Sequence, residues 1–227
     1  MLALARYITF DNFYMHVFFD LDGTLTNPRE GIVACICHAL TTLNIPIPAA
    51  AELDQWIGPP LEESFLALLQ CPDRATQAVT LYRDRFANLG LFENHVYGGI
   101  PEMLAVLAGE ADALWVTTAK PQVFAQKIVQ HFQLASFFAG IYGSEFDGTR
   151  AHKGDLLAYV LQAEAIDPRA VIMVGDRQHD MLGARQNGIT AVGVTWGFGT
   201  EDELQAAGAI ALCHTPADLP DILPTLK

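Results

Sequence analysis

The sequence predicts an α/β protein: a Rossmann-like core built on a parallel sheet, into which a small α-helical cap domain is inserted. Three observations predict this fold. Short apolar runs rich in β-forming residues alternate with helical stretches along most of the chain. One long segment after the first predicted strand shows helical periodicity alone. Acidic, hydroxyl and basic residues follow several of the apolar runs, where the strands of such a sheet would end.

Six apolar runs are the predicted strands of the sheet. Each is short, and most are separated by a stretch with helical periodicity. Helices are predicted from residue 121 to about 131, from 154 to about 163 and, after the fourth strand, as far as Asn187, where Gly188 offers a left-handed cap. The strands are predicted over residues 16–19, 113–117, 140–142, 171–174, 191–194 and 210–212.

Residues 29–94 are the predicted insertion. Helices are expected there over residues 32–43, 60–69 and 75–89, and prolines mark the joins between them. Both ends of the insertion enter the sheet beside the first strand. The cap should therefore lie over the carboxyl ends of the strands, where open α/β sheets bind ligands. The expected domains are a core of residues 1–28 and 95–227 and a cap of residues 29–94.

The composition indicates a folded protein that does not bind polyanions. Of the 227 residues, 51% are hydrophobic and 17% are charged, which allows a buried core. The formal net charge is −13 and no basic run is present, so neither a nucleic acid polymer nor an anionic membrane surface is an expected partner. A small phosphorylated metabolite is compatible, because a metal ion and one lysine can reverse the field inside a cleft. The oligomeric state cannot be read from the sequence.

A cytoplasmic location is expected. No apolar run is long enough to span a membrane, and Arg6 and Asp11 interrupt the mildly apolar N-terminal stretch, which makes it a poor signal peptide. The four cysteines show no spacing typical of a zinc site. Met15 lies directly before the first predicted strand, so residues 1–14 are expected to be dispensable, with an ordered extra strand as the alternative.

The strongest functional signal is a pair of carboxylates at the end of the first strand. Asp20 and Asp22 are two residues apart and are followed by Gly23 and Thr24, so the chain should leave the sheet in a tight turn. Asp20 would then point along the strand into a cleft, and the backbone N–H groups of the turn would be free to hold an anion. The alternative is a turn whose aspartates cap their own backbone.

Three further strand ends carry groups that suit phosphate chemistry. Asp176 and Asp180 are four residues apart, and their oxygens suit Mg²⁺; the alternative is a loop residue and an ordinary helix N-cap. At Thr118 and Ala119, a hydroxyl and free backbone N–H groups could grip a phosphate, although a plain N-cap threonine is also compatible. Lys153 begins another helix and, taken alone, would be a solvated surface lysine.

Together, these groups form an ordered set that unrelated helix caps would not be expected to give. The chain resembles the haloacid dehalogenase superfamily, in particular its phosphatases of the phosphoglycolate phosphatase type, from Met15 to about Leu223. The Asp-x-Asp-Gly-Thr motif is highly specific for that superfamily, whereas the other motifs are individually loose. Family-like stretches also include Ile57-Gly58-Pro59-Pro60-Leu61 in the insertion and the segment from Tyr142 to Arg150.

The resemblance implies catalytic roles for four residues. Asp20 would be the nucleophile that forms a phospho-aspartate, which divides one difficult hydrolysis into two in-line displacements. Asp22 would protonate the leaving alkoxide and then activate the hydrolytic water. Thr118 and Lys153 would hold the transferring phosphoryl group.

The resemblance also implies a Mg²⁺ site and a substrate site. Asp20, Asp176 and the backbone carbonyl of Asp22 would bind the metal, and Asp180 would support the site. A divalent ion is physically reasonable, because a carboxylate that attacks a phosphate dianion must first overcome charge repulsion. The residues expected to contact the substrate are Gly23, Thr24, Trp56, Ala119 and Arg150.

The predicted function is therefore a Mg²⁺-dependent phosphatase acting on small phosphate monoesters, with a 5′-nucleotidase as the alternative. Trp56 could stack on a nucleoside, unless it only fills the core of the cap. Phosphoglycolate would need a cation for its carboxylate. The segment His152-Lys153-Gly154-Asp155 departs from the Lys-Pro-x-Pro of many relatives, which weakens the transfer of that substrate. The only candidate cations in the cap are Arg29, Arg74, Arg83 and Arg85.

Two further alternatives use the same fold. A sugar phosphomutase would share the core residues, but no additional Arg–Lys signature is present in the insertion. A non-enzymatic regulatory protein would be expected to have lost a catalytic carboxylate, and all of them are present.

Overall fold

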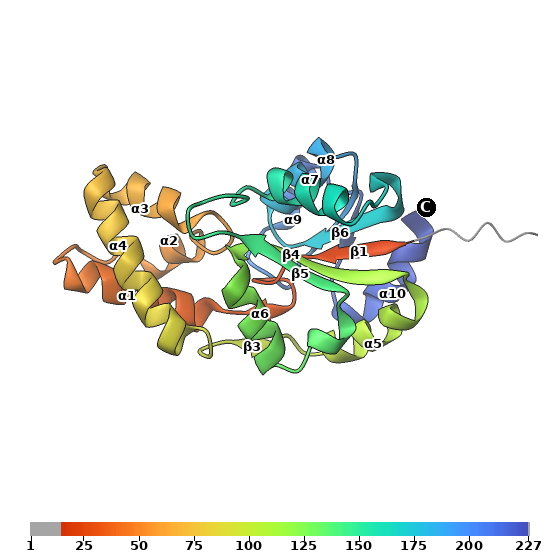
Figure 1. Ribbon diagram of the computed structural model, residues 1–227, viewed down its shortest axis with the longest axis horizontal. Helices are drawn as coiled ribbons and strands as arrows, with labels where there is room; N and C mark the ends of the chain where they lie inside the picture. The colour runs from red at the N-terminus through yellow and green to blue at the C-terminus, as the bar shows by residue number, and fades with distance from the viewer. Residues whose placement is uncertain (1–14, 227) are drawn as a thin grey trace, which may run out of the picture.

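The strand that precedes Asp20 lies inside a six-stranded parallel sheet with the order β5-β4-β1-β6-β7-β8 (Figure 1). The structure is a computed structural model that describes residues 15–226, so the expectation about residues 1–14 lies outside the described residues. The order confirms the predicted α/β class with a parallel sheet. The strands are β1 (His16–Phe19), β4 (Ala113–Pro121), β5 (Gly140–Ser144), β6 (Val171–Gly175), β7 (Thr190–Val194) and β8 (Ala211–Cys213).

Strand β1 is paired on both sides, and this pairing aligns the functional loops. Phe19 is opposite Val116 of β4 and Val174 of β6, so β1 and β6 end at nearly the same level, while β4 continues to Pro121. Residues along β1 alternate between two cores: Phe18 packs on one face of the sheet, and Val17 and Phe19 pack on the other. Burial on both faces is typical of a parallel sheet covered by helices.

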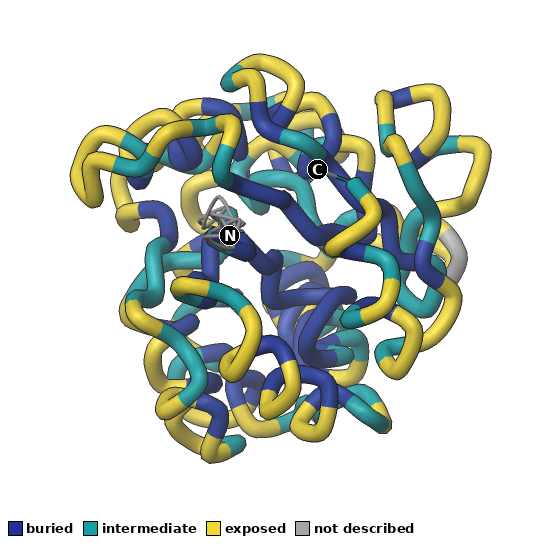
Figure 2. Tube along the Cα trace, turned by 90° about the vertical axis from the view of Figure 1, so that its right-hand side faces the viewer, coloured by how far each residue is buried: buried dark blue, intermediate teal, exposed yellow. Residues whose placement is uncertain are grey.

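Helices cover both faces of the sheet. On one face lie α7 (Lys153–Ala163), α8 (Gln178–Gln186) and α9 (Glu201–Ala207). On the other lie α5 (Ile100–Glu110), α6 (Gln122–His131) and α10 (Leu219–Ile222). Figure 2 shows the buried residues concentrated in the interior and the exposed ones on the outer turns. Within residues 15–226 the core also contains four short 3₁₀ helices: Ala135–Phe137, Pro168–Ala170, Pro216–Asp218 and Leu223–Leu226.

The helical insertion lies at one end of the sheet (Figure 1). A short antiparallel pair, β2 (Thr26–Asn27) and β3 (His95–Val96), joins it to the core at the point where the chain leaves and re-enters. Tyr82, Phe65 and Phe86 form its aromatic centre, with the rings of Tyr82 and Phe86 stacked at 5.3 Å. Its helices are α1 (Arg29–Thr42), α2 (Ala50–Asp54), α3 (Leu61–Leu69) and α4 (Pro72–Arg85), followed by a π-helical turn, Phe86–Gly90.

The structure differs from the predicted elements in several places. Strand β4 continues to Pro121, so this proline precedes α6 instead of opening it, and its backbone is extended with φ −52° and ψ 129°. Helices α2, α5 and α9 were not predicted from the sequence. The short patterns of α2 and α9 become helical through packing on neighbouring elements. Helix α5 does have the apolar spacing of a helix, with Ile100, Met103, Leu104 and Leu107 buried, and sequence reasoning missed it. Among residues 15–226, no helix is both long enough and apolar enough to cross a membrane.

Candidate active site

The loop after β1 places two aspartates at the carboxyl end of this strand. The Asp20 backbone N–H donates to the Val174 carbonyl at 3.0 Å, which extends the pairing of β1 and β6 by one residue. The chain then turns at Gly23, whose φ is +86°. A β-carbon on Gly23 would lie 2.1 Å from the Asp176 Oδ2 atom, so only glycine lets this loop approach so closely.

Three carboxylates meet beside this loop. Asp20, Asp176 and Asp180 each offer one oxygen, and these oxygens lie within 4.8 Å of one another. Burial, and then the charges of Asp180 and Asp20, raise the pKa of Asp176 well above its usual range. Burial is also the main cause that raises the pKa of Asp180. The cluster therefore holds more negative charge than its buried position favours, and a divalent cation would offset that charge.

The Asp176 carboxylate is fixed by neutral donors. The Thr24 hydroxyl donates to its Oδ1 atom at 3.2 Å, and the Phe198 backbone N–H donates to its Oδ2 atom at 2.8 Å. Asp180 is in the first turn of α8, where its Oδ2 accepts the Arg177 backbone N–H at 3.2 Å. Both acids are thus held in place by backbone or hydroxyl groups before any ligand binds.

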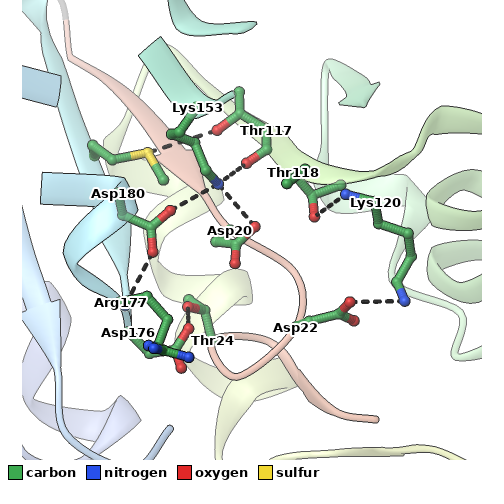
Figure 3. A network of polar contacts seen from close by, with 12 residues as sticks. Asp20, Asp22, Thr24, Thr117, Thr118, Lys120, Lys153, Asp176, Arg177 and Asp180 are labelled. Carbon is green, nitrogen blue, oxygen red and sulfur yellow. Dashed lines mark hydrogen bonds and ion pairs between the residues drawn. The ribbon is translucent and has the colours of Figure 1, made fainter. Parts of the chain in front are cut away.

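Lys153 brings a buried positive charge to the cluster (Figure 3). Its ammonium lies 2.9 Å from Asp20 Oδ1 and 2.7 Å from Asp180 Oδ1, and it donates to the Thr117 carbonyl at 2.7 Å. Burial acts to lower the pKa of Lys153, but the carboxylates of Asp180 and Asp20 outweigh it, and the pKa is raised. The lysine is therefore charged throughout the physiological pH range.

Asp22 has different surroundings from Asp20. Its carboxylate points toward Lys120, with 2.7 Å between Asp22 Oδ2 and the ammonium, while the Oδ1 atom is buried without a hydrogen-bond partner. Burial raises the pKa of Asp22, and the charge of Lys120 opposes that rise. Two carboxyl groups only two residues apart thus face different partners, which suits two different chemical roles.

The end of β4 supplies hydroxyl and backbone groups. Thr118 is buried, and its hydroxyl accepts the Lys120 backbone N–H at 3.3 Å. Thr118 and Ala119 line a cavity of about 120 Å³ together with Asp20, Asp22 and Lys153. Predicted groups that follow four separate strands, Asp20, Thr118, Lys153 and Asp180, therefore line one cavity, and Asp176 clusters with two of them.

The helical insertion, the predicted cap, also lines this cavity. The cap residues that line it include Trp56, Tyr82, Arg83 and Phe86. The Trp56 ring is half-buried and stands edge-on against Phe65, with 5.1 Å between ring centroids. Trp56 thus both packs within the cap and faces the cavity.

Three of the predicted substrate contacts need correction. Gly23 and Thr24 do not line the cavity, and their backbone N–H groups are used within the turn, donating to Thr26 O at 2.7 Å and Leu21 O at 3.4 Å. They position Asp176 instead. Arg150 does not line the cavity either: its side chain pairs with Glu145 and its guanidinium lies 4.3 Å from the centre of the Tyr159 ring.

The prediction for Asp22 assigned its backbone carbonyl, and not its carboxylate, to the metal. Its carboxylate is outside the cluster of Asp20, Asp176 and Asp180, because it is turned toward Lys120. A contribution from Asp22 to a metal site would therefore come from its backbone carbonyl, as the resemblance implied.

Sequence reasoning missed two residues of the site, Lys120 and Arg177. Both stand beside residues that were singled out, but nothing in their spacing shows which distant group each one contacts. Arg177 donates to the Ile57 carbonyl of the cap at 2.6 Å and to Glu203 of α9 at 2.9 Å. The sequence position next to Asp176 was the only available signal.

Comparison with known proteins agrees with this geometry. The family described as haloacid dehalogenase-like hydrolase matches residues 17–194. A 5′-nucleotidase of Pseudomonas aeruginosa is 46% identical over 211 residues, covering 92% of this chain and 96% of the relative. A tyrosine-protein kinase, PtkA of Mycobacterium tuberculosis, is 36% identical over 198 residues, covering 87% of this chain and 68% of the relative.

Solved structures have the same architecture. The crystal structure of a predicted phosphatase from Clostridium acetobutylicum superimposes with a TM-score of 0.90 at 39% identity, covering 94% of this chain and 99% of that one. A phosphoglycolate phosphatase of Vibrio vulnificus is more distant, at 26% identity over 216 residues, which cover 90% of this chain and 94% of the relative.

A parallel α/β core that collects carboxylates, a threonine and a lysine at its strand ends defines the class of this protein as a hydrolytic enzyme. The chain belongs to the haloacid dehalogenase-like hydrolase family. The predicted superfamily and the predicted enzyme class, a hydrolase with relatives named as phosphatases, are confirmed.

Proposed function

We propose that this protein is a Mg²⁺-dependent phosphatase that hydrolyses small phosphate monoesters through a phospho-aspartate at Asp20, with nucleoside monophosphates as the favoured substrates. One observation carries the proposal. Asp20 lines the cavity while an ammonium, a buried hydroxyl and two further carboxylates surround it. A divalent cation bound there, together with the Lys153 ammonium, would offset the charge of a phosphate dianion next to a nucleophilic carboxylate.

Each residue has a defined task in the proposed reaction. A carboxylate oxygen of Asp20 attacks phosphorus in line with the departing oxygen, while Lys153 and Thr118 hold the phosphoryl oxygens. Asp22 gives a proton to the leaving oxygen as the P–O bond breaks. In the second displacement Asp22 takes a proton from the attacking water, and Asp20 is released with inorganic phosphate.

The residues present fit a Mg²⁺ ion. The donor set is made of buried carboxylate oxygens, the ligand type that hard divalent cations prefer. Asp20, Asp176 and the backbone carbonyl of Asp22 would hold the ion, with Asp180 in support. When bound, the ion would neutralise charge on the phosphoryl group and help to orient it.

The charges around the cavity favour a leaving group without a carboxylate. Among the described residues, every lysine and arginine that lines the cavity is paired with an acid: Arg83 with Glu62, Arg177 with Glu203, and the two lysines with Asp22, Asp20 and Asp180. Of the four cap arginines considered for phosphoglycolate, only Arg83 reaches the cavity. A nucleoside needs no such cation.

The 5′-nucleotidase relative and the position of Trp56 support the same preference. Trp56 lines the cavity between cap and core, where the leaving group would lie. Stacking of a base on an aromatic side chain contributes about 1–3 kcal/mol. Phosphoglycolate remains the comparison substrate, since relatives with that name share the fold at lower identity.

The test compares kcat/KM for nucleoside monophosphates and phosphoglycolate in the wild type, Trp56→Ala and the control Trp56→Phe. We expect Trp56→Ala to lose about tenfold on nucleotides only, as stacking predicts, and Trp56→Phe to retain most activity. An equal loss on both substrates with a lowered Tm would show that Trp56 only stabilises the cap.

The same assay distinguishes hydrolysis from phosphoryl transfer to another acceptor. Hydrolysis releases one inorganic phosphate for each monoester consumed. Consumption of substrate without matching phosphate release would instead indicate a mutase, or the transfer to protein that the name of the kinase relative suggests. No turnover of any ester would favour the non-enzymatic alternative.

A further inference from the structure

Lys120 is a buried cation with no role in the reaction as described so far. It is the penultimate residue of β4, and its side chain is only 6% exposed. Its ammonium lies 2.7 Å from Asp22 Oδ2 and 4.4 Å from the centre of the Phe86 ring. Burial removes the water that would solvate this ammonium. The carboxylate oxygen and the aromatic face offset that loss of hydration.

The two oxygens of Asp22 are therefore inequivalent. Oδ2 is held by Lys120, whereas Oδ1 is buried without a hydrogen-bond partner. A buried acceptor is rarely left unpaired in a folded protein, so an unpaired oxygen at a cavity wall indicates a partner that arrives from outside. Asp22 lines the cavity that also contains Asp20, so a substrate group can be that partner.

We propose that Lys120 is a positioning residue for the acid–base group: it fixes Asp22 Oδ2 so that Oδ1 is the oxygen that exchanges the proton. This inference rests on the proposed function. In the first step the Oδ1 proton moves to the leaving oxygen as its bond to phosphorus breaks and the Asp20–phosphorus bond forms. In the second, the proton of the attacking water moves to Oδ1 as the water oxygen bonds to phosphorus and the Asp20–phosphorus bond breaks.

The two lysines contact different carboxylates, and this difference supports the assignment. Lys153 contacts Asp20 and Asp180 and so neutralises the phosphoryl side of the cavity, whereas Lys120 contacts neither of them. Figure 3 shows the Asp22 and Lys120 side chains pointing toward each other, apart from the cluster around Lys153. Lys120 is thus placed to orient the acid and not to bind the phosphate.

Phe86 adds a link to the cap. It is fully buried in the π-helical turn that follows α4, and its ring also packs against Tyr82 of the cap and Phe124 of the core. The ammonium of Lys120 thus rests on a cap residue while it holds a core residue. Lys120 thus contacts both parts of the molecule at the cavity.

The test uses the dependence of kcat/KM on the leaving group, since this constant reports the steps up to transfer of phosphorus to Asp20. Lys120→Met is compared with the control Lys127→Met, which removes an exposed lysine of α6. The substrates are a nucleoside monophosphate, whose alkoxide needs a proton to leave, and 2,4-dinitrophenyl phosphate, whose phenolate does not. We expect Lys120→Met to lose about thirtyfold or more on the nucleotide and less than about threefold on the aryl ester, with no change in Lys127→Met.

A double-mutant cycle separates positioning from folding. In an Asp22→Asn background, Lys120→Met should cause no further loss on the nucleotide, because the oriented acid is already absent. Lys120→Arg should restore part of the activity by keeping the cation. Equal losses on both esters, or a full additional loss in Asp22→Asn, would overturn the inference. A wild type that turns over neither ester would instead overturn the proposed function and, with it, this inference.

Discussion

Asp20 and Asp22 are two residues apart in sequence, yet each meets a different lysine. Lys153 lies against Asp20 and Lys120 against Asp22, at 2.9 and 2.7 Å. The chain leaves β1 at Asp20, and in the loop that follows the two side chains point toward different lysines. A nucleophile and an acid can then operate side by side without sharing a proton.

The first residue-scale prediction concerns the nucleophile. Asp20→Asn should abolish turnover, because a neutral amide is a far poorer nucleophile than a carboxylate. The Tm should not fall, since the change removes one of three mutually repelling carboxylates and leaves an oxygen that can accept from Lys153. The measurement is phosphate release together with the melting curve.

Asp22→Asn is the matched control for that variant. It should lose most activity on substrates with poor leaving groups and keep the fold intact. Activity above a few per cent of wild type in Asp20→Asn would contradict the covalent mechanism.

At the scale of elements, α8 links the sheet to the cap. Arg177, the residue before this helix, is 9% exposed and donates to the Ile57 carbonyl of the cap loop at 2.6 Å. Its Nε also donates to Glu203 of α9, which in turn accepts the Gln178 N–H at 2.9 Å. The strand end that supplies Asp176 is thereby coupled to the loop that positions Trp56.

Arg177→Met should weaken this link. We expect the free energy of unfolding to fall by about 3 kcal/mol, because the change leaves Glu203 partly buried without its cation and the Ile57 carbonyl without its donor. KM should rise more than kcat falls, since the cap loop loses its attachment while the catalytic carboxylates remain. Chemical denaturation and steady-state kinetics measure the two effects.

Arg169→Met provides the comparison, since Arg169 also pairs with an aspartate, Asp167 at 2.6 Å, but on the surface. Exposed ion pairs contribute little to stability, so no measurable change is expected. Similar losses of stability in both variants would refute the special role of Arg177.

At the scale of the whole molecule, the catalytic groups come from segments that are more than 150 residues apart in sequence, from Asp20 to Asp180. Parallel pairing of β1 with β4 and β6 brings their carboxyl ends to one edge. The helical insertion lies at that end of the sheet, and its residues also line the cavity. A chain with a net charge of −13 thus concentrates its buried acids at one point, where a cation can stabilise the whole fold.

Mg²⁺ should therefore raise the Tm of the wild type. A ligand that binds only the folded state stabilises it by about 2.7 kcal/mol at a hundredfold excess over its Kd. The increase should vanish in Asp176→Asn, and NaCl at matched ionic strength should not reproduce it. Ca²⁺ should support activity poorly, because the larger ion takes more ligands at longer distances.

Chelation provides the opposite test. Exhaustive removal of divalent cations should abolish turnover and lower the Tm to the value measured without added metal. Full activity after such treatment would remove the metal from the mechanism.

The sequence by itself determined the class of the fold and the main groups of the site. Alternating apolar and helical patterns are local, because each strand or helix is specified by its own residues, and they indicated the sheet correctly. The site groups could also be identified from the sequence by their position after each predicted strand, because the carboxyl ends of parallel strands lie at a common edge. Asp20, Thr118, Lys153, Asp176 and Asp180 were identified in this way, and the structure brings them to one cavity or its adjoining cluster.

Only the tertiary structure decided which partner each side chain meets. Lys120 holds Asp22, Arg177 reaches the cap, Gly23 packs against Asp176, and Arg150 turns away from the cavity toward Tyr159. These contacts join segments about 100 residues or more apart, except for that of Arg150, which depends on the conformation of its own loop. Spacing along the chain places a residue at an edge of the sheet, but the direction of its side chain follows from turns and packing that the pattern does not encode.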